Sequence, residues 1–324
     1  MRASVRPASM VLAASTSALV CACTPTLRRG LVAPEGVGRL EQVTLSGADE
    51  LDPAVSPDGA TIAFETADSQ GAPPRIETMA LKDAGTAGAP RATLGSADVV
   101  GLEPSWMPDG TGLVFLSRED GAYRIVQTFG PTPGRTHFVA AAGNASFPAL
   151  WPAVSPDGMH VALSMPGVDV FRTGWSSALS FDAALAVTDL FGTGMRVLGE
   201  GTDPTWSPHG KRLAFVRRAD DGHHHVYVAR ADGSDARAIT DGPDEDRLPA
   251  WSPDGERIAF CSVQTADDGS RRANVFVVRA DGSGLRQLTE GDRFACRPAW
   301  GRDGFVYFHA DATGHFHIWR VGPV

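Results

Sequence analysis

One motif recurs along most of this chain and constrains its fold more than any other feature. The clearest copy is LPAWSPDGERIAF at residues 248–260. Successive copies are separated by about 45 to 52 residues, the length of one four-stranded propeller blade. The repeat therefore predicts six blades. Each copy has a proline at the same place: Pro53, Pro104, Pro152, Pro204, Pro249 and Pro298.

Each repeat divides into strands. Pro-x-Trp predicts a short inner strand, because a proline at a strand start need not break a hydrogen-bond ladder. Asp-Gly predicts a tight hairpin, and the alternating residues after it predict a second strand with an apolar face. Third strands are clearest at residues 226–233 and 275–282. Large apolar residues in one register should wedge between adjacent blades: Val55, Trp106, Val154, Trp206, Trp251 and Trp300.

The two ends of the repeat array have complementary defects. Residues 40–47 (LEQVTLSG) are similar to the segments that end later repeats, but no blade precedes them. The C-terminal copy has only three strands before Val324. We therefore predict an all-β, six-bladed β-propeller over residues 39–324, with four-stranded blades and an N-terminal strand that completes the last blade.

The N-terminal residues have the features of an export signal. Arg2 and Arg6 precede a modest apolar run, and Val20-Cys21-Ala22-Cys23 follows it. That run resembles a bacterial lipobox, so we predict a lipoprotein signal peptide at 1–22, lipidation of Cys23 and a flexible tether at 23–38. Thr24 favours the outer membrane, facing the periplasm. The alternative is an ordinary secretory signal and a periplasmic or extracellular protein.

Charge and cysteine usage limit the partners. The formal charge of −9 disfavours binding to nucleic acid, and no apolar run after residue 23 is long enough to span a bilayer. In an oxidising compartment Cys261 and Cys296 could pair, because both should lie toward the same end of neighbouring blades. The sequence does not place their Cα atoms within bonding distance, so the disulfide stays open.

The repeated Pro-x-Trp-Ser-Pro-Asp-Gly, followed by Ile-Ala-Phe, resembles the WD-like repeat of TolB-type β-propellers. The resemblance covers residues 39–324 and implies six blades. It also implies a periplasmic binding protein, because the best-known member binds a peptidoglycan-associated lipoprotein at the mouth of its channel. We expect no counterpart of the α/β domain that precedes the propeller in TolB.

The residues before the six prolines should form a ring around the channel entrance. Three of them are acids, which could bind a divalent cation or a basic peptide group. The alternative is that they cap strands and face water. Leu248 occupies this position in the fifth copy. The others are the predicted partner-binding residues: Asp52, Glu103, Trp151, Asp203 and Arg297.

Three further features were weighed as sites. His223–His225 and the group His309, His315 and His317 contain metal-ligating side chains, but the two clusters lie two blades apart, so a solvated polar loop is the default interpretation of each. Residues 174–178 (GWSSA) resemble the nucleophile motif of prolyl-oligopeptidase-type peptidases, although Ala178 replaces a glycine. They fall in residues 168–190, which we predict to be an insertion between the second and third strands of blade three.

The sequence thus predicts a lipid-anchored, non-enzymatic protein-binding scaffold of the cell envelope, monomeric and without a cofactor. Its expected partner is an envelope protein or a peptidoglycan-associated component. Two alternatives remain: a hydrolase or lyase acting on carbohydrate or peptide, and a sensor of a small ligand or metal ion.

Overall fold

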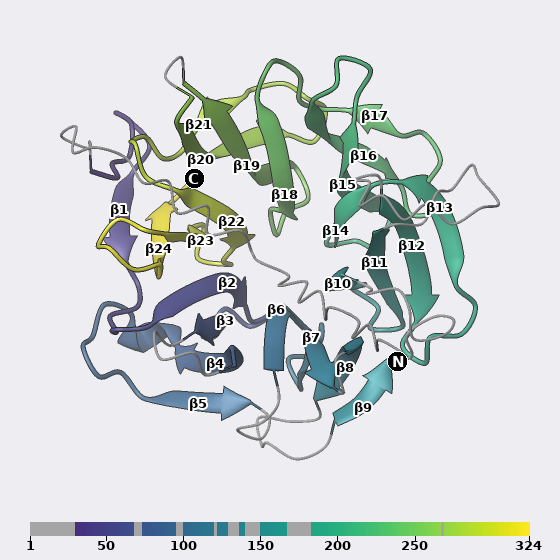
Figure 1. Cartoon of the computed structure of the whole chain (residues 1–324), viewed down its shortest axis with the longest axis horizontal. Coiled ribbons are helices and arrows are strands. Elements are labelled where there is room, and N and C mark those ends of the chain that lie inside the picture. Colours follow the sequence, from purple (N-terminus) through teal and green to yellow (C-terminus); the bar gives the residue numbers. More distant parts are fainter. Residues whose placement is uncertain are drawn as a thin grey trace, which may run out of the picture.

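The computed structural model describes residues 30–67, 73–94, 100–119, 122–128, 136–139, 150–166, 183–266 and 269–324. They form six four-stranded antiparallel sheets arranged around a central axis, as Figure 1 shows. The predicted fold class is confirmed. Within the described ranges, no helix has the length and apolar character needed to span a bilayer.

The sheets follow one another in sequence order, and each begins with its innermost strand. Blades one to three contain β2 (Asp49–Val55), β3 (Thr61–Ala67), β4 (Arg75–Ala80), β5 (Arg91–Leu94), β6 (Val100–Trp106), β7 (Leu113–Glu119), β8 (Ala122–Thr128), β9 (Thr136–Val139), β10 (Leu150–Val154), β11 (His160–Pro166), β12 (Ala183–Asp189) and β13 (Arg196–Glu200). A short 3-10 helix, Leu81–Asp83, follows β4.

Blades four to six repeat the pattern. They contain β14 (Thr202–Trp206), β15 (Arg212–Arg218), β16 (His224–Arg230), β17 (Arg237–Ala238), β18 (Glu245–Trp251), β19 (Arg257–Thr265), β20 (Arg271–Arg279), β21 (Arg286–Gln287), β22 (Ala295–Trp300), β23 (Val306–Ala310), β24 (His317–Gly322) and, from the N-terminus, β1 (Arg39–Gln42).

The hydrophobic core lies between the blades. The second strand of each sheet is buried on both faces: in β3, Ile62, Ala63 and Phe64 are all fully buried. Ala63 belongs to a cluster with Leu113 and Phe115 of blade two. Each blade therefore depends on its neighbours for burial, as expected for a radial repeat.

The tryptophans of the repeat join neighbouring blades, as predicted. The Nε1 of Trp106 donates a hydrogen bond to the carbonyl oxygen of Ala54 in the preceding blade, at 2.9 Å. Trp206 and Trp300 make the same contact one blade back, at 3.1 and 3.0 Å. In these three residues the aromatic ring supplies apolar contact area and the N–H is satisfied, whereas Nε1 of Trp251 has no hydrogen-bond partner among the described residues.

The predicted hairpin after each inner strand is also present. In blade one, the amide of Gly59 donates to the carbonyl of Ser56 at 2.8 Å, and Asp58 accepts a hydrogen bond from the Ser56 hydroxyl at 2.6 Å. Gly59 has a φ of 73°, which glycine adopts without steric cost. In blade four, Gly210 makes the same backbone turn although His209 replaces the aspartate.

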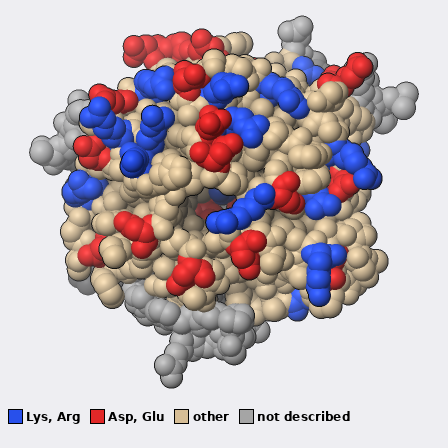
Figure 2. All heavy atoms as spheres, turned by 180° about the vertical axis from the view of Figure 1, so that it is seen from behind, with Lys and Arg blue, Asp and Glu red and all other residues tan. Residues whose placement is uncertain are grey.

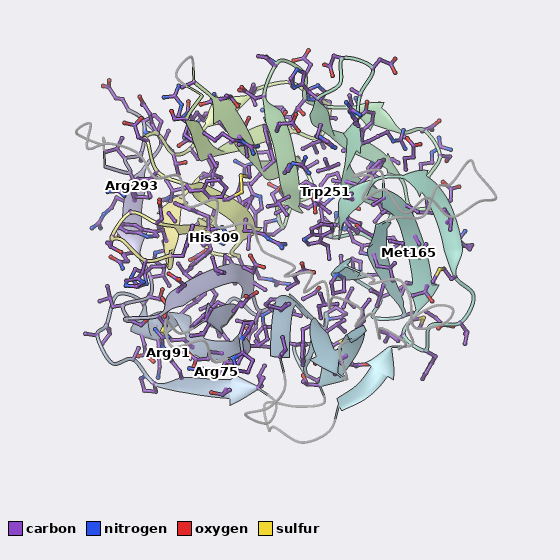
Figure 3. All side chains as sticks on the ribbon, viewed as in Figure 1. Arg75, Arg91, Met165, Trp251, Arg293 and His309 are labelled. Carbon is purple, nitrogen blue, oxygen red and sulfur yellow. A yellow bond between two sulfur atoms is a disulfide. The ribbon has the colours of Figure 1, made fainter. Side chains whose placement is uncertain are left out.

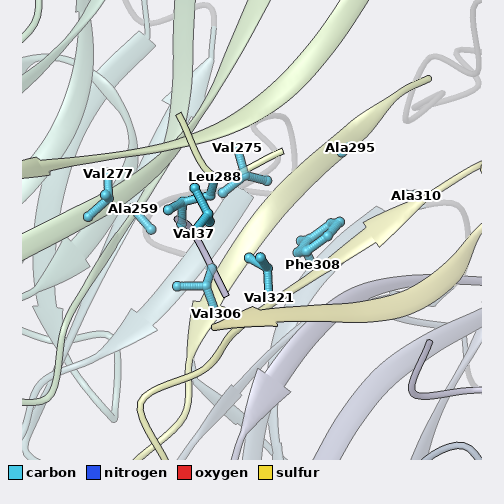
Figure 4. Packing of buried hydrophobic residues seen from close by; sticks show 10 residues of the cluster. All are labelled: Val37, Ala259, Val275, Val277, Leu288, Ala295, Val306, Phe308, Ala310 and Val321. Carbon is cyan, nitrogen blue, oxygen red and sulfur yellow. The ribbon is translucent and has the colours of Figure 1, made fainter. Parts of the chain in front are cut away.

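The ring closes as the sequence predicts, because β1 pairs with β24 and completes blade six. The chain is also packed before β1. Val32 forms a β-bridge with Glu290, and Val37 is buried in a cluster with Leu288 and Val306 (Figure 4). The part of the proposed tether from residue 31 onward therefore contacts blades five and six.

The boundaries of the blade-three insertion need correction. Residues 183–189 are not part of it: they form β12, which pairs with β11 over its whole length. The sequence AALAVTD begins with a continuous apolar run, is buried over its first six residues and supplies the regular third strand of this blade. Residues 174–178 lie outside the described residues.

Candidate functional site

A β-bulge in every inner strand builds the ring of residues before the prolines. The strand pairing shifts register at this point in all six blades. The bulged residue has a φ between 52° and 58°, which is rare for residues other than glycine and costs on the order of 1–3 kcal/mol. All six copies adopt it: Asp52, Glu103, Trp151, Asp203, Leu248 and Arg297.

The bulges bring the predicted partner-binding residues together around one cavity. Its volume is about 120 Å³, and only the six ring residues and the prolines that follow them line it. The face seen in Figure 2 is hollowed at its centre, with acidic atoms inside the hollow. The bulge is shared by all six copies, so it belongs to the fold, whereas the chemistry depends on the side chain at each position.

One half of the ring is held by Arg297. Its Nε lies 3.0 Å from Oδ1 of Asp52, and its Nη2 lies 3.5 Å from Oε1 of Glu103. The other oxygen of Glu103, Oε2, accepts a hydrogen bond from the backbone amide of Trp151 at 2.7 Å. Neither oxygen of Asp52 has a hydrogen-bond partner of good geometry among the described residues, so its contact with Arg297 is an ion pair only.

A second layer of side chains lies beneath the ring. Glu65 on β3 is 2% exposed, and its Oε2 has no hydrogen-bond partner among the described residues. His309 on β23, the strand beside β22 (Figure 3), accepts a hydrogen bond through Nδ1 from the amide of Asp52 at 3.2 Å. Ser164 on β11 accepts one from the amide of Asp203 at 3.1 Å.

Sequence reasoning missed this second layer. Histidine 309 was considered only as a loop ligand, and neither Glu65 nor Ser164 was considered. A signal for them is present in the sequence, because all three directly follow the residue at one register position of a second strand: Phe64, Leu163 and Phe308.

Burial controls the ionisation of these groups. It raises the pKa of Glu103 to about 7, against the influence of Arg297 and with a contribution from Asp52. Burial and repulsion from Asp52 raise the pKa of Glu65 well above its usual range. Burial also lowers the pKa of His309 to about 4, so this histidine is neutral near pH 7. Burial lowers the pKa of Arg297, but the surrounding acids outweigh it and the net change is upward.

The opposite half of the ring has no cation of its own. Asp203 is 6% exposed, its Oδ1 has no hydrogen-bond partner, and it makes no ion pair with a described residue. Burial raises the pKa of Asp203, opposed at longer range by Arg247 and Arg297. Its neighbours around the cavity are Trp151 and Leu248.

The histidine clusters lie in the seams between blades. Glu245 of blade five contacts both His223 and His224 of blade four, with Nδ1 to carboxylate distances of 3.3 and 2.7 Å. In blade six, Nδ1 of His317 lies 3.0 Å from Oε2 of Glu50 in blade one. No cluster suited to a metal ion occurs among the described residues. These histidines therefore join blades through acid contacts.

The two cysteines whose pairing the sequence leaves open form a disulfide. Cys261 on β19 and Cys296 on β22 have a Cα–Cα distance of 5.0 Å, and the bond joins blades five and six. It lies next to the ring, because Cys296 directly precedes Arg297. Cys23 lies outside the described residues.

The ring, the bulges and the closure are features of the whole repeat array. The array can be compared with known proteins to identify its family. A family model of the TolB beta propeller domain matches residues 144–318, more than half of the chain. The chain belongs to the TolB β-propeller family. A search of curated proteins finds no match.

Solved structures of similar proteins agree on the fold. A putative TolB from Agrobacterium tumefaciens is 19% identical with a TM-score of 0.61, over 88% of this chain and 97% of that one. TolB from Acinetobacter baumannii is 20% identical with a TM-score of 0.57, over 78% of this chain and only 57% of that one. An oligogalacturonate lyase from Vibrio parahaemolyticus is 11% identical with a TM-score of 0.57, over 91% and 96%. Similar propellers therefore include an enzyme.

Proposed function

We propose that this propeller is a non-enzymatic binding scaffold of the cell envelope, which docks a protein or a peptidoglycan-associated partner at the mouth of its channel. The cavity carries the proposal, because buried carboxylate oxygens of Asp52, Asp203 and Glu65, which line it or lie beneath it, have no hydrogen-bond partner among the described residues. Buried polar groups are normally satisfied, and exceptions concentrate where a ligand completes the set. Membership of the TolB β-propeller family supports the same function.

The closed ring suits this role physically. Each ring residue is fixed by a bulge and a proline, and each blade is packed between two others. A rigid site loses little conformational entropy when a partner binds. The side chains at the six positions can therefore differ without loss of the surrounding geometry.

The leader supports an envelope location. If Cys23 carries the lipid, its Cα lies about seven residue steps from that of Gly30, a span of at most roughly 25 Å. The propeller would then stay close to the membrane surface. Replacing Cys23 by alanine should move the protein from the membrane fraction to the soluble fraction. A variant that stays in the membrane fraction would contradict lipid anchoring at this cysteine.

A binding comparison tests the scaffold directly. The tagged protein and an Asp52→Asn, Glu103→Gln, Asp203→Asn variant should be used to recover partners from an envelope extract. The control removes three exposed acids outside the cavity, by Asp220→Asn, Asp241→Asn and Glu256→Gln. A partner lost from the ring variant and kept by the control supports channel-mouth docking. A partner bound equally by all three proteins contradicts it.

One observation favours an enzyme as a second candidate. The pKa of about 7 at Glu103 is the value that suits a general acid or base, and one similar structure is a lyase. Under this alternative the protein would turn over a carbohydrate or peptide. A Glu103→Gln variant would then lose turnover while still binding the substrate. Retained turnover in that variant would exclude Glu103 as the catalytic group.

A further inference from the structure

The two halves of the ring differ in how their charges are compensated. Asp52 and Glu103 share Arg297, which lies 3.0 and 3.5 Å from them. Asp203 has no such ion-pair partner in the part of the chain that the structure describes, although only 6% of its surface is exposed. A buried carboxylate without a counter-ion is costly, because desolvation is not offset by an ion pair. This half of the cavity is therefore electrostatically incomplete.

The surroundings of Asp203 indicate what would complete it. Trp151 and Leu248 are its neighbours on the ring, and the rest of the lining consists of prolines and of Arg297 with its two acid partners, Asp52 and Glu103. The face of a tryptophan attracts an ammonium or guanidinium group, and an alkyl chain gains by contact with leucine and proline. The lining therefore combines a negative charge, an aromatic ring and apolar surface.

We propose that the channel-mouth cavity binds one organic cation, an alkylammonium or guanidinium group, with its charge at Asp203 and its alkyl chain against Trp151 and Leu248. The inference rests on the proposed function in placing the site at the channel mouth, and it adds the chemical class that the site recognises. Such a group is carried by a lysine or arginine side chain of a partner and also by free amines.

The size of the cavity agrees with a group of this kind. A buried water needs roughly 10–15 Å³, and the cavity offers about 120 Å³. It therefore accommodates several waters or the end of one long side chain, but not a folded segment. The rest of a larger partner would lie outside, over the face of the propeller.

A metal ion fits this site less well. Calcium takes six to eight oxygen ligands, whereas the cavity carries three acids, of which Asp52 and Glu103 already contact Arg297. The described residues contain no metal-binding cluster. Trp151 and Leu248 supply no oxygen side chain. An organic cation needs only one carboxylate and uses the apolar wall.

Binding should also release protons. Glu103 has a pKa of about 7, so near neutral pH it is partly protonated. A cation brought into the same cavity favours the ionised form of Glu103 and displaces that proton to the buffer. Calorimetric heats of binding near pH 7 should therefore depend on the ionisation enthalpy of the buffer.

The experiment titrates the purified full chain with small probes in an isothermal calorimeter. Pentylamine and butylguanidine carry the two cationic groups, and 1-pentanol is the uncharged control. We expect both cations to bind, with proton release, and the alcohol not to bind. Asp203→Asn should weaken cation binding by at least about tenfold, whereas Glu256→Gln, at an exposed acid outside the cavity, should leave it unchanged.

A second variant keeps the test valid if Asp203→Asn fails to fold. Trp151→Leu removes the aromatic face but keeps an apolar side chain, and it should also weaken cation binding. Absence of binding by both cations, equal binding by wild type and variants, or calcium binding without cation binding would overturn the inference. If no cation binds but a partner is still lost from the ring variant, the scaffold function stands and only this inference fails.

Capped peptides distinguish the two sources of the cation. Gly-Lys-Gly and Gly-Arg-Gly are compared with Gly-norleucine-Gly and with the free amines. Tighter binding of the cationic peptides than of pentylamine and butylguanidine supports a protein side chain as the ligand. Tighter binding of the free amines supports a small molecule. Both results keep the cationic site, and preference for the norleucine peptide contradicts it.

Discussion

Arg297 of blade six and Asp52 of blade one form an ion pair, with Nε 3.0 Å from Oδ1. The two residues belong to the last and first copies of the repeat, and they meet where blade one packs against blade six, at the junction that β1 closes by pairing with β24. The charge balance of the cavity is therefore a property of the closed propeller. Mutations that disrupt ring closure should therefore also disturb the cavity, and mutations of the paired charges in the cavity should also weaken closure.

Arg297→Gln should destabilise the protein by about 3–5 kcal/mol, because removing one partner leaves buried carboxylates uncompensated. Urea unfolding at neutral pH measures the change. The matched control is Arg230→Gln, which breaks an exposed ion pair with Asp235 and should cost only about 0–1 kcal/mol. Equal losses in the two variants would show that the ring acids do not depend on Arg297.

The Glu103→Gln variant should become more stable relative to the wild type as pH rises. The folded-state pKa of Glu103 is about 7, above its usual value. Between pH 4.5, the ordinary pKa of this carboxyl, and about pH 7, the unfolded chain therefore loses this proton before the folded chain does. The wild type loses up to about 3 kcal/mol of stability as pH rises through this interval. Urea unfolding at pH values across this interval should show that the unfolding free energy of the variant rises relative to that of the wild type. A difference that does not vary with pH would contradict the raised pKa.

His309→Gln should change the pH dependence in the opposite sense. The folded-state pKa of His309 is about 4, so the unfolded chain takes up the proton first and the wild type loses stability as pH falls from about 6.5 toward 4. The glutamine variant lacks this loss, and its unfolding free energy should fall less over that interval. Parallel curves for variant and wild type would show that His309 is not held neutral.

The sequence predicted the parts of this fold that repeat. The tryptophans, the Asp-Gly hairpins and the alternating second strands recur in register, so their local physics is visible in any two copies. The positions of the ring residues followed from the same register. Their conformation did not, because a φ above 50° at a residue before proline runs against ordinary preference and arises from the bulge.

The second layer was harder to predict for a different reason. Glu65 and His309 affect the ring because neighbouring blades bring them beneath it, and contacts between blades are not encoded in the period of one strand. The disulfide illustrates the same limit: register placed Cys261 and Cys296 at one end of adjacent blades, but only the interblade packing brings their Cα atoms to 5.0 Å.

The disulfide should contribute measurably to stability. It closes a loop with a sequence separation of 35, for which chain entropy gives about 3 to 4 kcal/mol. A Cys261→Ala, Cys296→Ala variant should melt lower than the oxidised wild type, and reductant should lower the melting temperature of the wild type only. Thiol titration checks the redox state. Two free thiols in the untreated wild type would show that the pair is not bonded.

Three truncations should separate the contributions of the N-terminal segment to closure. A chain that begins at Gly30 retains all the described residues and is the reference. A chain that begins at Arg39 loses the burial of Val37, worth about 1.5–3 kcal/mol. A chain that begins at Ala48 also loses β1, which leaves β24 as an open edge that can pair with other molecules.

Calorimetry and size-exclusion chromatography should therefore rank the truncated chains. We expect a small fall in melting temperature for the chain that begins at Arg39. The chain that begins at Ala48 should melt at least about 10 °C below the reference, the effect of several kcal/mol in a domain of this size, and should form oligomers. Because Arg297 meets Asp52 across the same junction, the affinity of this truncated chain for organic cations should fall in parallel. A monomer with the melting temperature of the reference would show that β1 is dispensable for closure.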